Sequence, residues 1–549
     1  MTSREQWVLG PPGTGKTTFL SRTIASLVDK RGADAVTVCS FSKAAATELV
    51  ARDLPIEDSH VGTLHALCYR ALSRPTIAET KIDDWNDFAP EYRLQSSGAS
   101  QVDDPLSGED MNAASESDKV FGDYMLLRAR AVDRALWPPQ VEAFARKWEF
   151  WTSNSGFVDF QGLIDLGLRD LEQCPGEPQV LIADEVQDSS ASELLLLRKW
   201  QEHTDYAIFA FDDDQAVYAF RGASPEALLA AHVPLDNQRV LRQSYRVPAA
   251  VHALSQKWIR QVTLRQEKEY LPRVDKATGQ PVQGECRWMP QGNWKNAEAL
   301  LNDAEQYLQA GKSVMFLSSC GYMLDPLKAV LRKRGMPFHN PYRKTRADWN
   351  PLAGREGTVG AKDRLLAYLA PMTAGRPWNP AECDQWFDIL ASKGVLSHGA
   401  KQTLSRAVDE ERELTNEEVV SLFQDEESFT NAFGGVLDPN LQWLENHLLP
   451  SKARGMCFPM EIYRRGGLDL LQKKPQITIG TVHSVKGGEA DVVYLIPDLS
   501  LSSMQQWSVY GPARDAIVRL FYVGMTRAKE SLILTAPATS FYVETWGGV

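Results

Sequence analysis

The chain has 549 residues, 59 Lys and Arg against 71 Asp and Glu, and a formal net charge of −12 at pH 7. Its composition, 43% hydrophobic and 24% charged, is ordinary for a globular protein, and no apolar run approaches the roughly 20 residues of a membrane span. The seven cysteines form no C-x-x-C pair, which argues against a zinc ribbon, an iron–sulfur cluster or a disulfide framework. We expect a soluble cytoplasmic protein, nucleoid-associated if bacterial or phage, with no membrane partner.

The acidic balance does not exclude a nucleic-acid partner. Binding to nucleic acid depends on a local groove rather than on the total charge. Part of the negative charge is also concentrated in one stretch, residues 103–118, which holds six acids and no base.

The chain opens with a pattern typical of a strand, a glycine-rich loop and a helix. The stretch "VLGPPGTGKTT" (8–18) fits the phosphate-binding pattern G-x-x-x-x-G-K-[ST], and we expect the helix to run from about Lys16 to Asp29. Backbone N–H groups of such a loop cradle phosphates, and its Lys contacts the β- and γ-phosphates. The loop predicts a nucleoside triphosphate site, but many unrelated classes of protein share it.

Three further strands are expected in the first part of the chain, at 35–40, 179–185 and 206–211, and a helix over "KAAATELVARD" (43–53). The second and third of these strands lead into acidic residues. Short apolar strands alternating with helices indicate a doubly wound parallel sheet, which binds ligands at the carboxyl ends of its strands. Lys16, Asp184 and Asp212 should therefore converge on one crevice.

The alternation stops twice, and each time a mainly helical insertion is expected. Between about Pro75 and Phe157 the stretches "YMLLRARAVDRALW" and "VEAFARKWEFW" are predicted to be helical, after a Ser/Gly/Asp-rich loop. A second α/β unit begins near Gly284 and resumes after Lys474 with "QITIGTVHS", "DVVYLIPDL" and "SLILTAP". The intervening residues 346–472, rich in Trp, form the second predicted insertion.

The acidic pair at the end of the third strand suits phosphoryl transfer. That reaction needs a carboxylate to help hold Mg²⁺ and a second group to orient and deprotonate water. Asp184 suits the first role, with Thr17 as co-ligand, and Glu185 suits the second. Two solvated acids at a strand end are the alternative, which the nearby phosphate loop disfavours.

Four later stretches occur in a fixed order: "FDDDQAVYAFRGA" (211–223), "LRQSYRVP" (241–248), "TIGTVHSVKGGEADVVYL" (478–495) and "RLFYVGMTRAK" (519–529). Together with "FSKAAATEL" and "VGTLHALCYRAL" they resemble the ordered motifs of superfamily 1 helicases of the UvrD/PcrA/Rep type. The resemblance implies an α/β fold of two RecA-like P-loop NTPase domains with parallel sheets, each interrupted by a helical insertion. The expected parts are 1–75 and 158–282 for the first domain, 76–157 for its insertion, 283–345 and 473–549 for the second domain, and 346–472 for its insertion.

The resemblance also implies the nucleotide site and its cofactors, ATP and Mg²⁺. Gln215 would sense the γ-phosphate or the attacking water, while Arg246 and Arg527 would bring positive charge to the transferring phosphoryl group, Arg527 from the second α/β domain. Tyr245 matches the family's adenine-stacking aromatic residue, and Glu489 its ribose contact. The remaining nucleotide-binding positions are those of the loop: Gly10, Pro11, Pro12, Gly13, Thr14, Gly15, Lys16, Thr17 and Thr18.

Single-stranded nucleic acid needs stacking platforms, each stacked base contributing about 1–3 kcal/mol. The positions that match the family's strand-binding groove are Phe41, His65, Tyr218 and Phe220, with Arg221 and His483 for phosphate or coupling contacts. Core packing is the alternative for each aromatic residue. The implied partners are single-stranded DNA and duplex junctions; protein partners are not indicated.

The sequence departs from the family at three places. Relatives carry an adenine-contacting Gln on a helix upstream of the loop, whereas only nine residues precede Gly10. Either the start is truncated or misassigned, or Tyr245 and its neighbours hold adenine alone, and we expect a relaxed nucleotide preference. Gly488 replaces the usual Leu beside Glu489, and the second insertion is shorter than usual.

Three functions stay open at this point. The first is an ATP-dependent DNA helicase or translocase, moving 3′→5′ on single strands by ATP-driven closure of the two domains. The second is a DNA-stimulated ATPase that acts as a translocase or protein-displacing switch with little unwinding; it shares every motif with the first. The third is a non-motor NTP-binding regulatory module, against which the intact Asp184, Glu185, Gln215 and Arg527 argue.

Overall fold

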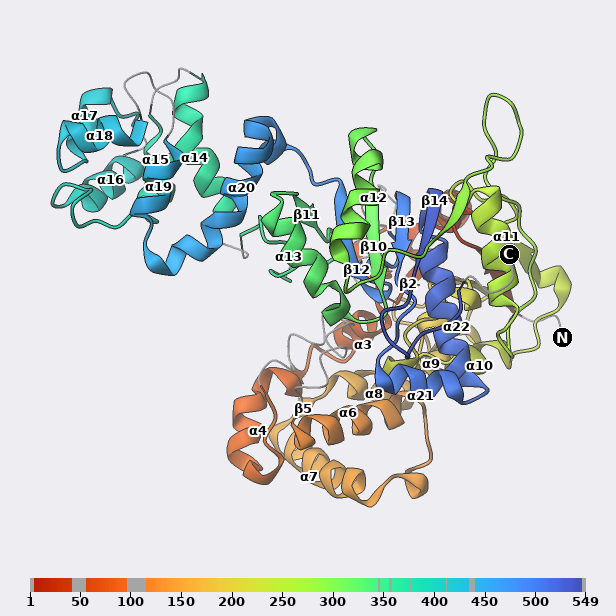
Figure 1. The fold of residues 1–549 in the computed structure, drawn as a ribbon. Coiled ribbons are helices and arrows are strands. Elements are labelled where there is room, and N and C mark those ends of the chain that lie inside the picture. The colour runs from red at the N-terminus through yellow and green to blue at the C-terminus, as the bar shows by residue number, and fades with distance from the viewer. Residues whose placement is uncertain are drawn as a thin grey trace. The chain divides into compact units, whose positions relative to one another are not determined.

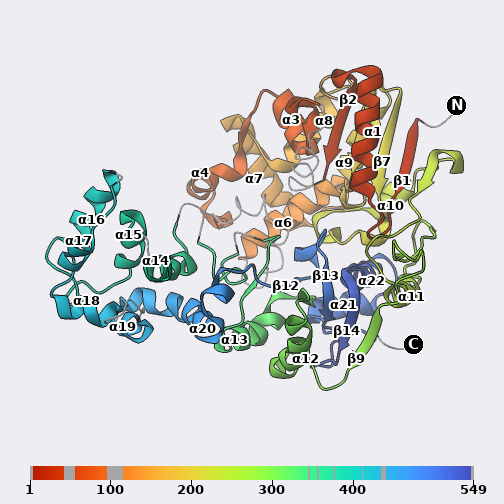
Figure 2. The ribbon, with the colours of Figure 1, turned by 90° about the horizontal axis from the view of Figure 1, so that it is seen from above.

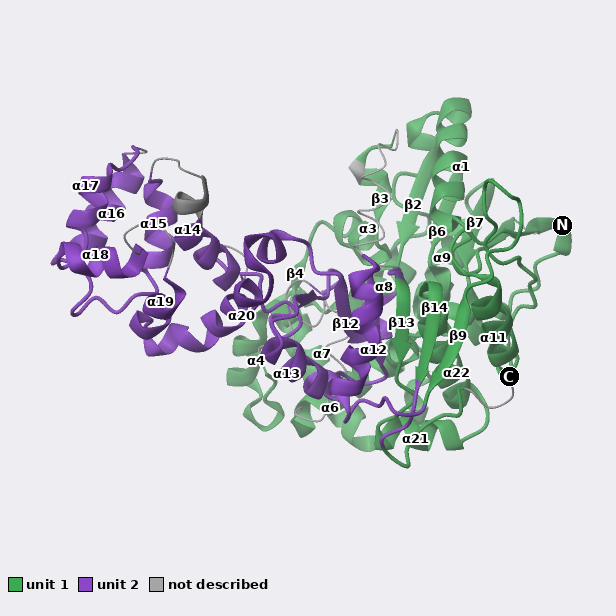
Figure 3. Ribbon diagram, turned by 45° about the horizontal axis from the view of Figure 1, so that its top comes forward, with its two compact units in different colours: residues 1–289, 491–534, 539–549 green, residues 290–490, 535–538 purple. Residues whose placement is uncertain are grey.

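The computed structural model describes residues 4–41, 56–95, 115–343, 346–354, 358–374, 378–410, 412–433 and 440–545. It divides into two compact units, which Figure 3 colours separately: unit 1 comprises 1–289, 491–534 and 539–549, and unit 2 comprises 290–490 and 535–538. The helix expected over 43–53 and most of the acidic stretch 103–118 lie outside the described residues. Over the described ranges, no helix combines the length and the apolar character that crossing a membrane requires.

Unit 1 contains a six-stranded sheet whose printed pairings are all parallel, in the order β3-β2-β6-β7-β1-β8. Its strands are β1 (Glu5–Leu9), β2 (Val36–Ser40), β3 (Val61–Gly62), β6 (Val180–Asp184), β7 (Tyr206–Phe211) and β8 (Gln238–Val240). Strands β2 and β6 are buried throughout, and β1 and β7 at all but one residue each, as expected of a parallel sheet with both faces covered. The predicted doubly wound sheet is confirmed.

Helices cover both faces of this sheet (Figure 2). On one face, α1 (Lys16–Arg31) packs Leu20 and Ile24 against strand residues such as Val36. The other face is covered by α3 (Leu64–Ala71), α8 (Phe160–Asp170) and α9 (Ala191–Gln201). The register aligns the strand exits, since Leu9 pairs with Phe211 and Asp184 with both Ser40 and Ala210. The loops that follow β1, β6 and β7 therefore share one edge.

The first insertion has an aromatic core. A short parallel pair, β4 (Thr76–Ile77) and β5 (Phe157–Val158), marks its base, and its helices are α4 (Ile82–Phe88), α6 (Glu116–Ala129) and α7 (Pro139–Ser155). Trp85, Trp148 and Trp151 are buried in its centre. The helix predicted over "YMLLRARAVDRALW" ends at Ala129, because Ala131 turns into the left-handed region (φ 52°) before a 3-10 turn at Arg134–Leu136.

The remainder of unit 1 combines elements from the middle and from the end of the chain. It includes α10 (Pro225–Leu229), α11 (Ala249–Ile259), β9 (Glu285–Met289), α21 (Leu501–Ser508), α22 (Pro512–Met525) and β14 (Ala528–Thr535). Helix α22 contacts α11 and the 3-10 turn Asp213–Gln215. Buried polar contacts fix it there: Asp515 accepts the backbone N–H of Thr263, and Arg519 donates to the carbonyl of Leu264 (2.7 Å).

Unit 2 combines a parallel β11-β12-β10 arrangement with a helical insertion (Figure 1). The strands are β10 (Val314–Ser318), β11 (Phe338–His339) and β12 (Ile477–Thr481), beside α12 (Ala297–Gln309) and α13 (Asp325–Lys333). The helices of the insertion are α14 (Ala361–Ala374), α15 (Pro380–Phe387), α16 (Ala400–Asp409), α17 (Asn416–Ser421), α18 (Glu426–Phe433), α19 (Leu441–His447) and α20 (Pro450–Gln472), the last kinked at Gly466 and Gly467.

The parallel α/β sheets with helical insertions confirm the predicted fold class of two RecA-like domains. The strands expected of the second domain are divided between the compact units. Strands β10, β11 and β12 belong to unit 2, while unit 1 holds β9, all of β13 (Ala490–Leu495) except its first residue and all of β14 except its last. The predicted domain boundaries follow a different division and stay a prediction.

Candidate nucleotide and nucleic-acid site

The phosphate loop lies between β1 and α1, at the shared edge of strand exits. Gly13 (φ 71°) and Gly15 (φ 78°) both adopt left-handed backbone, which L side chains rarely tolerate. Gly15 is the N-cap of α1, and as a glycine it has no side chain to accept a hydrogen bond from the first turn of that helix. The first N–H groups of a helix without a side-chain cap suit an anionic ligand. The loop therefore fits the triphosphate that its sequence predicts.

The segment Ser244–Pro248 packs directly against this loop. The backbone N–H of Tyr245 donates to the carbonyl of Gly13 (2.8 Å), and Ser244 Oγ donates to the carbonyl of Pro12 (2.8 Å). A Cβ on Gly13 would lie 2.5 Å from the Cβ of Arg246, so only glycine allows this approach. The structure thus brings Tyr245, whose ring is exposed, and Arg246 to the phosphate loop.

Lys16 lies between the two acids of the β6 exit. Its Nζ donates to Asp184 Oδ1 (2.7 Å) and also contacts Glu185 Oε1. Burial lowers the pKa of Lys16, but the charges of Asp184 and Glu185 outweigh it and raise the pKa above the ordinary value. Burial also raises the pKa of Asp184, against the attraction of Lys16. The sequence prediction that Lys16 and Asp184 converge is confirmed by this contact.

Gln187 connects the β6 exit to the β7 exit. Its Nε2 donates to Glu185 Oε2, and its Oε1 accepts the backbone N–H of Asp212 (3.2 Å). Glu185 itself adopts a left-handed backbone (φ 56°), which is unusual for a residue with a side chain. The sequence analysis did not single out Gln187, although it lies two residues after Glu185 in the same loop.

Gln215 and Arg527 meet beyond the β7 exit. Gln215 Nε2 donates to Asp212 Oδ2 (2.7 Å), and Arg527 Nη2 donates to Gln215 Oε1 (2.8 Å). Arg527 is buried, and its Nε donates to the carbonyl of Val523 at the end of α22 (3.0 Å). Both residues lie in unit 1, which also holds the phosphate loop.

A buried ion cluster that the sequence analysis missed supports this turn. Lys268 Nζ lies 3.0, 2.6 and 2.9 Å from carboxylate oxygens of Asp212, Asp213 and Asp214, respectively, and Arg265 Nε donates to Asp214 Oδ1 (2.9 Å). Burial lowers the pKa of Lys268, but the three aspartates raise it above its ordinary value. The stretch that contains Arg265 and Lys268, "RQEKEY" (265–270), has the composition of a solvated loop, so nothing in it signals burial.

An aromatic stack brings together three of the residues predicted to bind a strand: Phe41, Tyr218 and Phe220. Phe41 and Tyr218 have ring centroids 5.6 Å apart and nearly parallel planes (24°), and Phe220 meets Tyr218 edge-on at 6.0 Å. The guanidinium of Arg221 lies 5.8 Å from the centroid of Phe41. Tyr218 is 7% exposed and Phe220 41%, so Tyr218 supports the stack while Phe220 reaches solvent.

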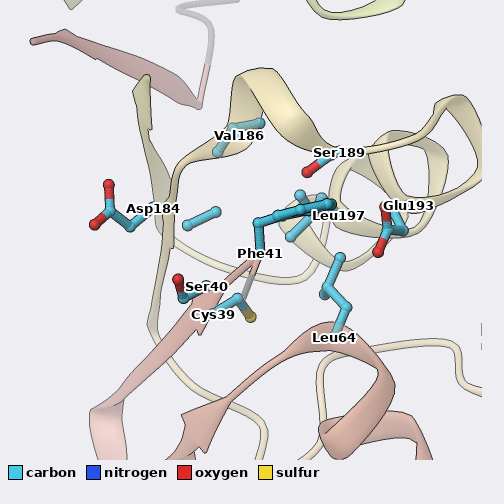
Figure 4. A pocket seen from close by; sticks show the side chains of 10 residues that line it. Cys39, Ser40, Phe41, Leu64, Asp184, Val186, Ser189, Glu193 and Leu197 are labelled. Atoms are coloured by element: carbon cyan, nitrogen blue, oxygen red, sulfur yellow. The ribbon is translucent and has the colours of Figure 1, made fainter. Parts of the chain in front are cut away.

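Figure 4 shows a small pocket that surrounds the ring of Phe41. The carboxylate of Asp184 points away from that ring, although Asp184 also lines the pocket. Phe41 follows Ser40 of β2, which pairs with Asp184 of β6, so the aromatic stack and the acid that contacts Lys16 lie at adjacent strand ends. The lining residues come from β2, α3, β6 and the segment up to α9: Cys39, Ser40, Phe41, Leu64, Ala183, Asp184, Val186, Ser189, Glu193 and Leu197.

His65 is held by neighbouring helices. Its ring stacks on Phe160 of α8 (centroids 4.7 Å apart), and its Nδ1 lies 3.5 Å from Glu193 of α9. Burial lowers the pKa of His65 even though Glu193 acts in the opposite direction. An imidazole held by a stacking ring and a carboxylate suits a supporting role in the strand-binding groove.

Two predicted site residues belong to unit 2. His483 begins a 3-10 turn after β12, and Glu489 precedes β13. A Cβ on Gly488 would lie 2.7 Å from the ring of Tyr342. The glycine that replaces the usual leucine therefore accommodates this tyrosine.

Fold and site together are those of a P-loop nucleoside triphosphatase in which Phe41 of the aromatic stack follows β2, the strand that pairs with β6 and its terminal Asp184. Residues 1–235 match the model of the UvrD/REP helicase N-terminal domain, and residues 464–539 match that of the UvrD-like helicase C-terminal domain. These matches cover more than half of the chain, which belongs to the UvrD family of helicases.

Similar proteins span nearly the whole chain at low identity. A "Probable DNA helicase II homolog" of Mycoplasma genitalium is 23% identical over 95% of this chain and 81% of the relative. Its counterpart in Mycoplasma capricolum is 22% identical over 96% of this chain and 81% of the relative. The "ATP-dependent DNA helicase UvrD2" of Mycobacterium tuberculosis is 24% identical over 96% of this chain and 76% of the relative.

Proposed function

We propose that this protein is an ATP-dependent DNA helicase that moves along single-stranded DNA. The observation that carries the proposal is the placement of Gln215. Through Asp212 and Arg527 it belongs to the nucleotide site, and it lies on the same short segment as Tyr218 and Phe220 of the aromatic stack. A change at the nucleotide site therefore reaches a strand-binding surface within a few residues.

In the nucleotide site, each group has one task. Bound ATP supplies the phosphoanhydride bond, and the N–H groups of the loop hold its phosphates. Asp184 and Thr17 suit Mg²⁺, which prefers oxygen ligands, and the second acid, Glu185, orients and deprotonates water. Lys16 exchanges a carboxylate partner for a phosphate oxygen, while Arg246 and Arg527 stabilise developing negative charge.

The finer parts of the proposal rest on the family resemblance. They are movement in the 3′→5′ direction, ATP-driven closure of two RecA-like domains with the boundaries predicted above, contacts of Tyr245 with adenine and of Glu489 with ribose, and duplex junctions as the preferred substrate. Phe41, Phe220 and Arg221 would contact the strand, with Tyr218 and His65 supporting them and His483 coupling the two activities. Because the proposed substrate is DNA, we expect the protein to act inside the cell, at the nucleoid of a bacterial host.

A translocase with little unwinding is the second candidate, because it uses the same contacts. Two measurements on the full chain separate the candidates: ATP hydrolysis with and without single-stranded DNA, and strand displacement on duplexes with a 3′ or a 5′ tail. A helicase of the proposed polarity hydrolyses ATP faster with DNA and opens the 3′-tailed duplex. Stimulation without displacement indicates the translocase, and equal, unstimulated hydrolysis contradicts both motors. A preference for the 5′ tail contradicts the polarity.

A further inference from the structure

Lys268 lies outside all the motifs on which the family resemblance rests, yet it lies at the centre of the most buried charge cluster among the described residues of the nucleotide site. Its side chain is 1% exposed, and its ammonium group contacts three consecutive aspartates, Asp212, Asp213 and Asp214. The backbone N–H of Gln266 also donates to Asp213 Oδ2 (2.8 Å). The segment around Lys268 thus contacts the acids that follow β7 and holds them in place.

Stability alone is a weak explanation for such a cluster. Removing several charges from water costs several kcal/mol per ion, and apolar replacements of buried ion pairs are often neutral or stabilising. A cluster of this kind does fix the orientation of every group that it contacts. The question is which oriented group matters for the reaction.

The orientation passes from Lys268 to Gln215 through Asp212. An ionised carboxylate only accepts hydrogen bonds, so Asp212 Oδ2 can face the amide nitrogen of Gln215 but not its oxygen. The amide oxygen then points to Arg527, whose Nη2 donates to it. A protonated or displaced Asp212 removes this restriction, so Asp212 no longer selects one orientation of the Gln215 amide.

We propose that Lys268 is a positioning residue for ATP hydrolysis: by holding the carboxylate of Asp212, it fixes the amide of Gln215 in the orientation that engages Arg527. The inference rests on the proposed ATPase function and adds to it a residue on which the rate depends without contact with the nucleotide.

The electrostatic surroundings of Asp212 support this role. Burial raises the pKa of Asp212 to about 6, and Lys268 opposes the rise. The other charged groups facing Asp212 are Asp213 and Asp214, which also raise its pKa, and the hydroxyls of Tyr270 and Tyr522 lie nearby. Without Lys268, the largest opposing influence is gone, and the pKa of Asp212 rises towards neutral pH.

The test replaces Lys268 with methionine, which keeps the length of the side chain and removes its charge. We expect Lys268→Met to lower the DNA-stimulated kcat roughly 10- to 100-fold, the usual effect of losing an outer-shell partner. KM for ATP and Kd for single-stranded DNA should stay within about twofold. The acid limb of the kcat–pH profile should also move to higher pH, which a merely structural role does not produce.

A matched control exists in unit 2. Lys328 is also buried and bridges two carboxylates, Asp325 and Asp348, each at 2.7 Å. Lys328→Met should alter thermal stability while leaving kcat and its pH profile unchanged. If both variants lose stability but only Lys268→Met loses kcat, the effect belongs to the nucleotide site.

A second variant keeps the test valid if Lys268→Met folds poorly. Lys268→Met/Asp213→Asn removes one positive and one negative charge together and restores the charge balance of the cluster. We expect it to fold and still show the low kcat, because Asp212 remains unsupported. A wild-type kcat and pH profile in the folded double variant, or in Lys268→Met itself, would overturn the inference. Absence of DNA-stimulated hydrolysis in the unmodified protein would instead contradict the proposed function.

Discussion

Two lysines contact the acids at the exits of β6 and β7, neighbouring strands of one sheet, but their surroundings differ. Lys16, after β1, contacts the two acids at the exit of β6, and its side chain is 10% exposed beside Glu185 at 28%. Lys268 contacts the three acids at the exit of β7 and is 1% exposed. One cluster reaches solvent at a loop suited to phosphate, whereas the other is closed on all sides.

This difference in exposure gives the two lysines different roles: Lys16 exchanges a carboxylate partner for a ligand, whereas Lys268 supports its neighbours. Lys16 can trade a carboxylate for a ligand oxygen, because its partner Glu185 is accessible and it lies at the start of a helix whose N-cap, Gly15, has no side chain. Lys268 has no such access, so its charge serves to orient Asp212 and, through it, Gln215. Removing the first lysine should therefore abolish the reaction, while removing the second should only slow it.

The largest expected effect is that of Lys16→Ala. The variant loses the cation that contacts the phosphates, and two neighbouring carboxylates then repel them, so hydrolysis should fall to the background of the assay. Phosphate release measured with saturating DNA checks this. The exposed Lys30, on the last turn of α1, provides the control, since Lys30→Ala should hydrolyse ATP at the normal rate.

Phe220→Ala tests the aromatic side of the same segment. Loss of one stacking platform should weaken binding of single-stranded DNA by about 1–3 kcal/mol, or roughly 5- to 150-fold in Kd, while basal hydrolysis is spared. Fluorescence anisotropy with a labelled oligonucleotide measures the change. Phe150→Ala is the matched control, because Phe150 is 59% exposed on α7 and belongs to the first insertion. Equal losses in both variants would contradict the assignment of the stack.

The sequence predicted the first lysine cluster and missed the second for a physical reason. Lys16 and Asp184 both lie at ends of apolar strands, and a parallel sheet brings such ends together. Lys268 follows no strand, and its charged neighbours are typical of a solvated loop. Only the packing of that loop beneath the β7 exit reveals its burial.

The contact that Arg527 makes is a second feature that could not be predicted from the sequence alone. The resemblance assigned it to the nucleotide site, but its contact with Gln215 depends on how α22 packs on the 3-10 turn Asp213–Gln215. No local pattern encodes that packing. The placement of Tyr218, which is buried beneath exposed Phe220, likewise depends on which ring faces solvent and not on the residue type.

We expect a smaller change in kcat when the pH is lowered. Asp212 has a pKa of about 6 in the folded protein, above its ordinary 3.8, so it gains a proton as the pH falls through 6. Protonation frees the amide of Gln215, and kcat should drop up to about tenfold between pH 7 and pH 5, because each pH unit below the pKa leaves tenfold less carboxylate. The rate at saturating ATP and DNA, measured across this range, provides the check.

The contribution of Asp212 to the stability of the fold changes with pH in the opposite direction to kcat. A carboxyl group whose pKa is raised on folding binds its proton more tightly in the folded state, so its contribution to the free energy of unfolding grows as the pH falls from about 6 to about 4. The acid loss of rate should therefore appear without unfolding. A thermal midpoint that falls in parallel with kcat would contradict this explanation.

The contact between Gln215 and Arg527 is the central claim, and a double-mutant cycle on kcat at saturating ATP and single-stranded DNA tests it most directly. Arg527→Ala removes a charge of the arginine-finger kind, worth about 10³–10⁵ in rate, and Gln215→Ala removes its partner. If the two act as one unit, the double variant is about as slow as Arg527→Ala alone. Losses that multiply independently in the double variant would contradict the account.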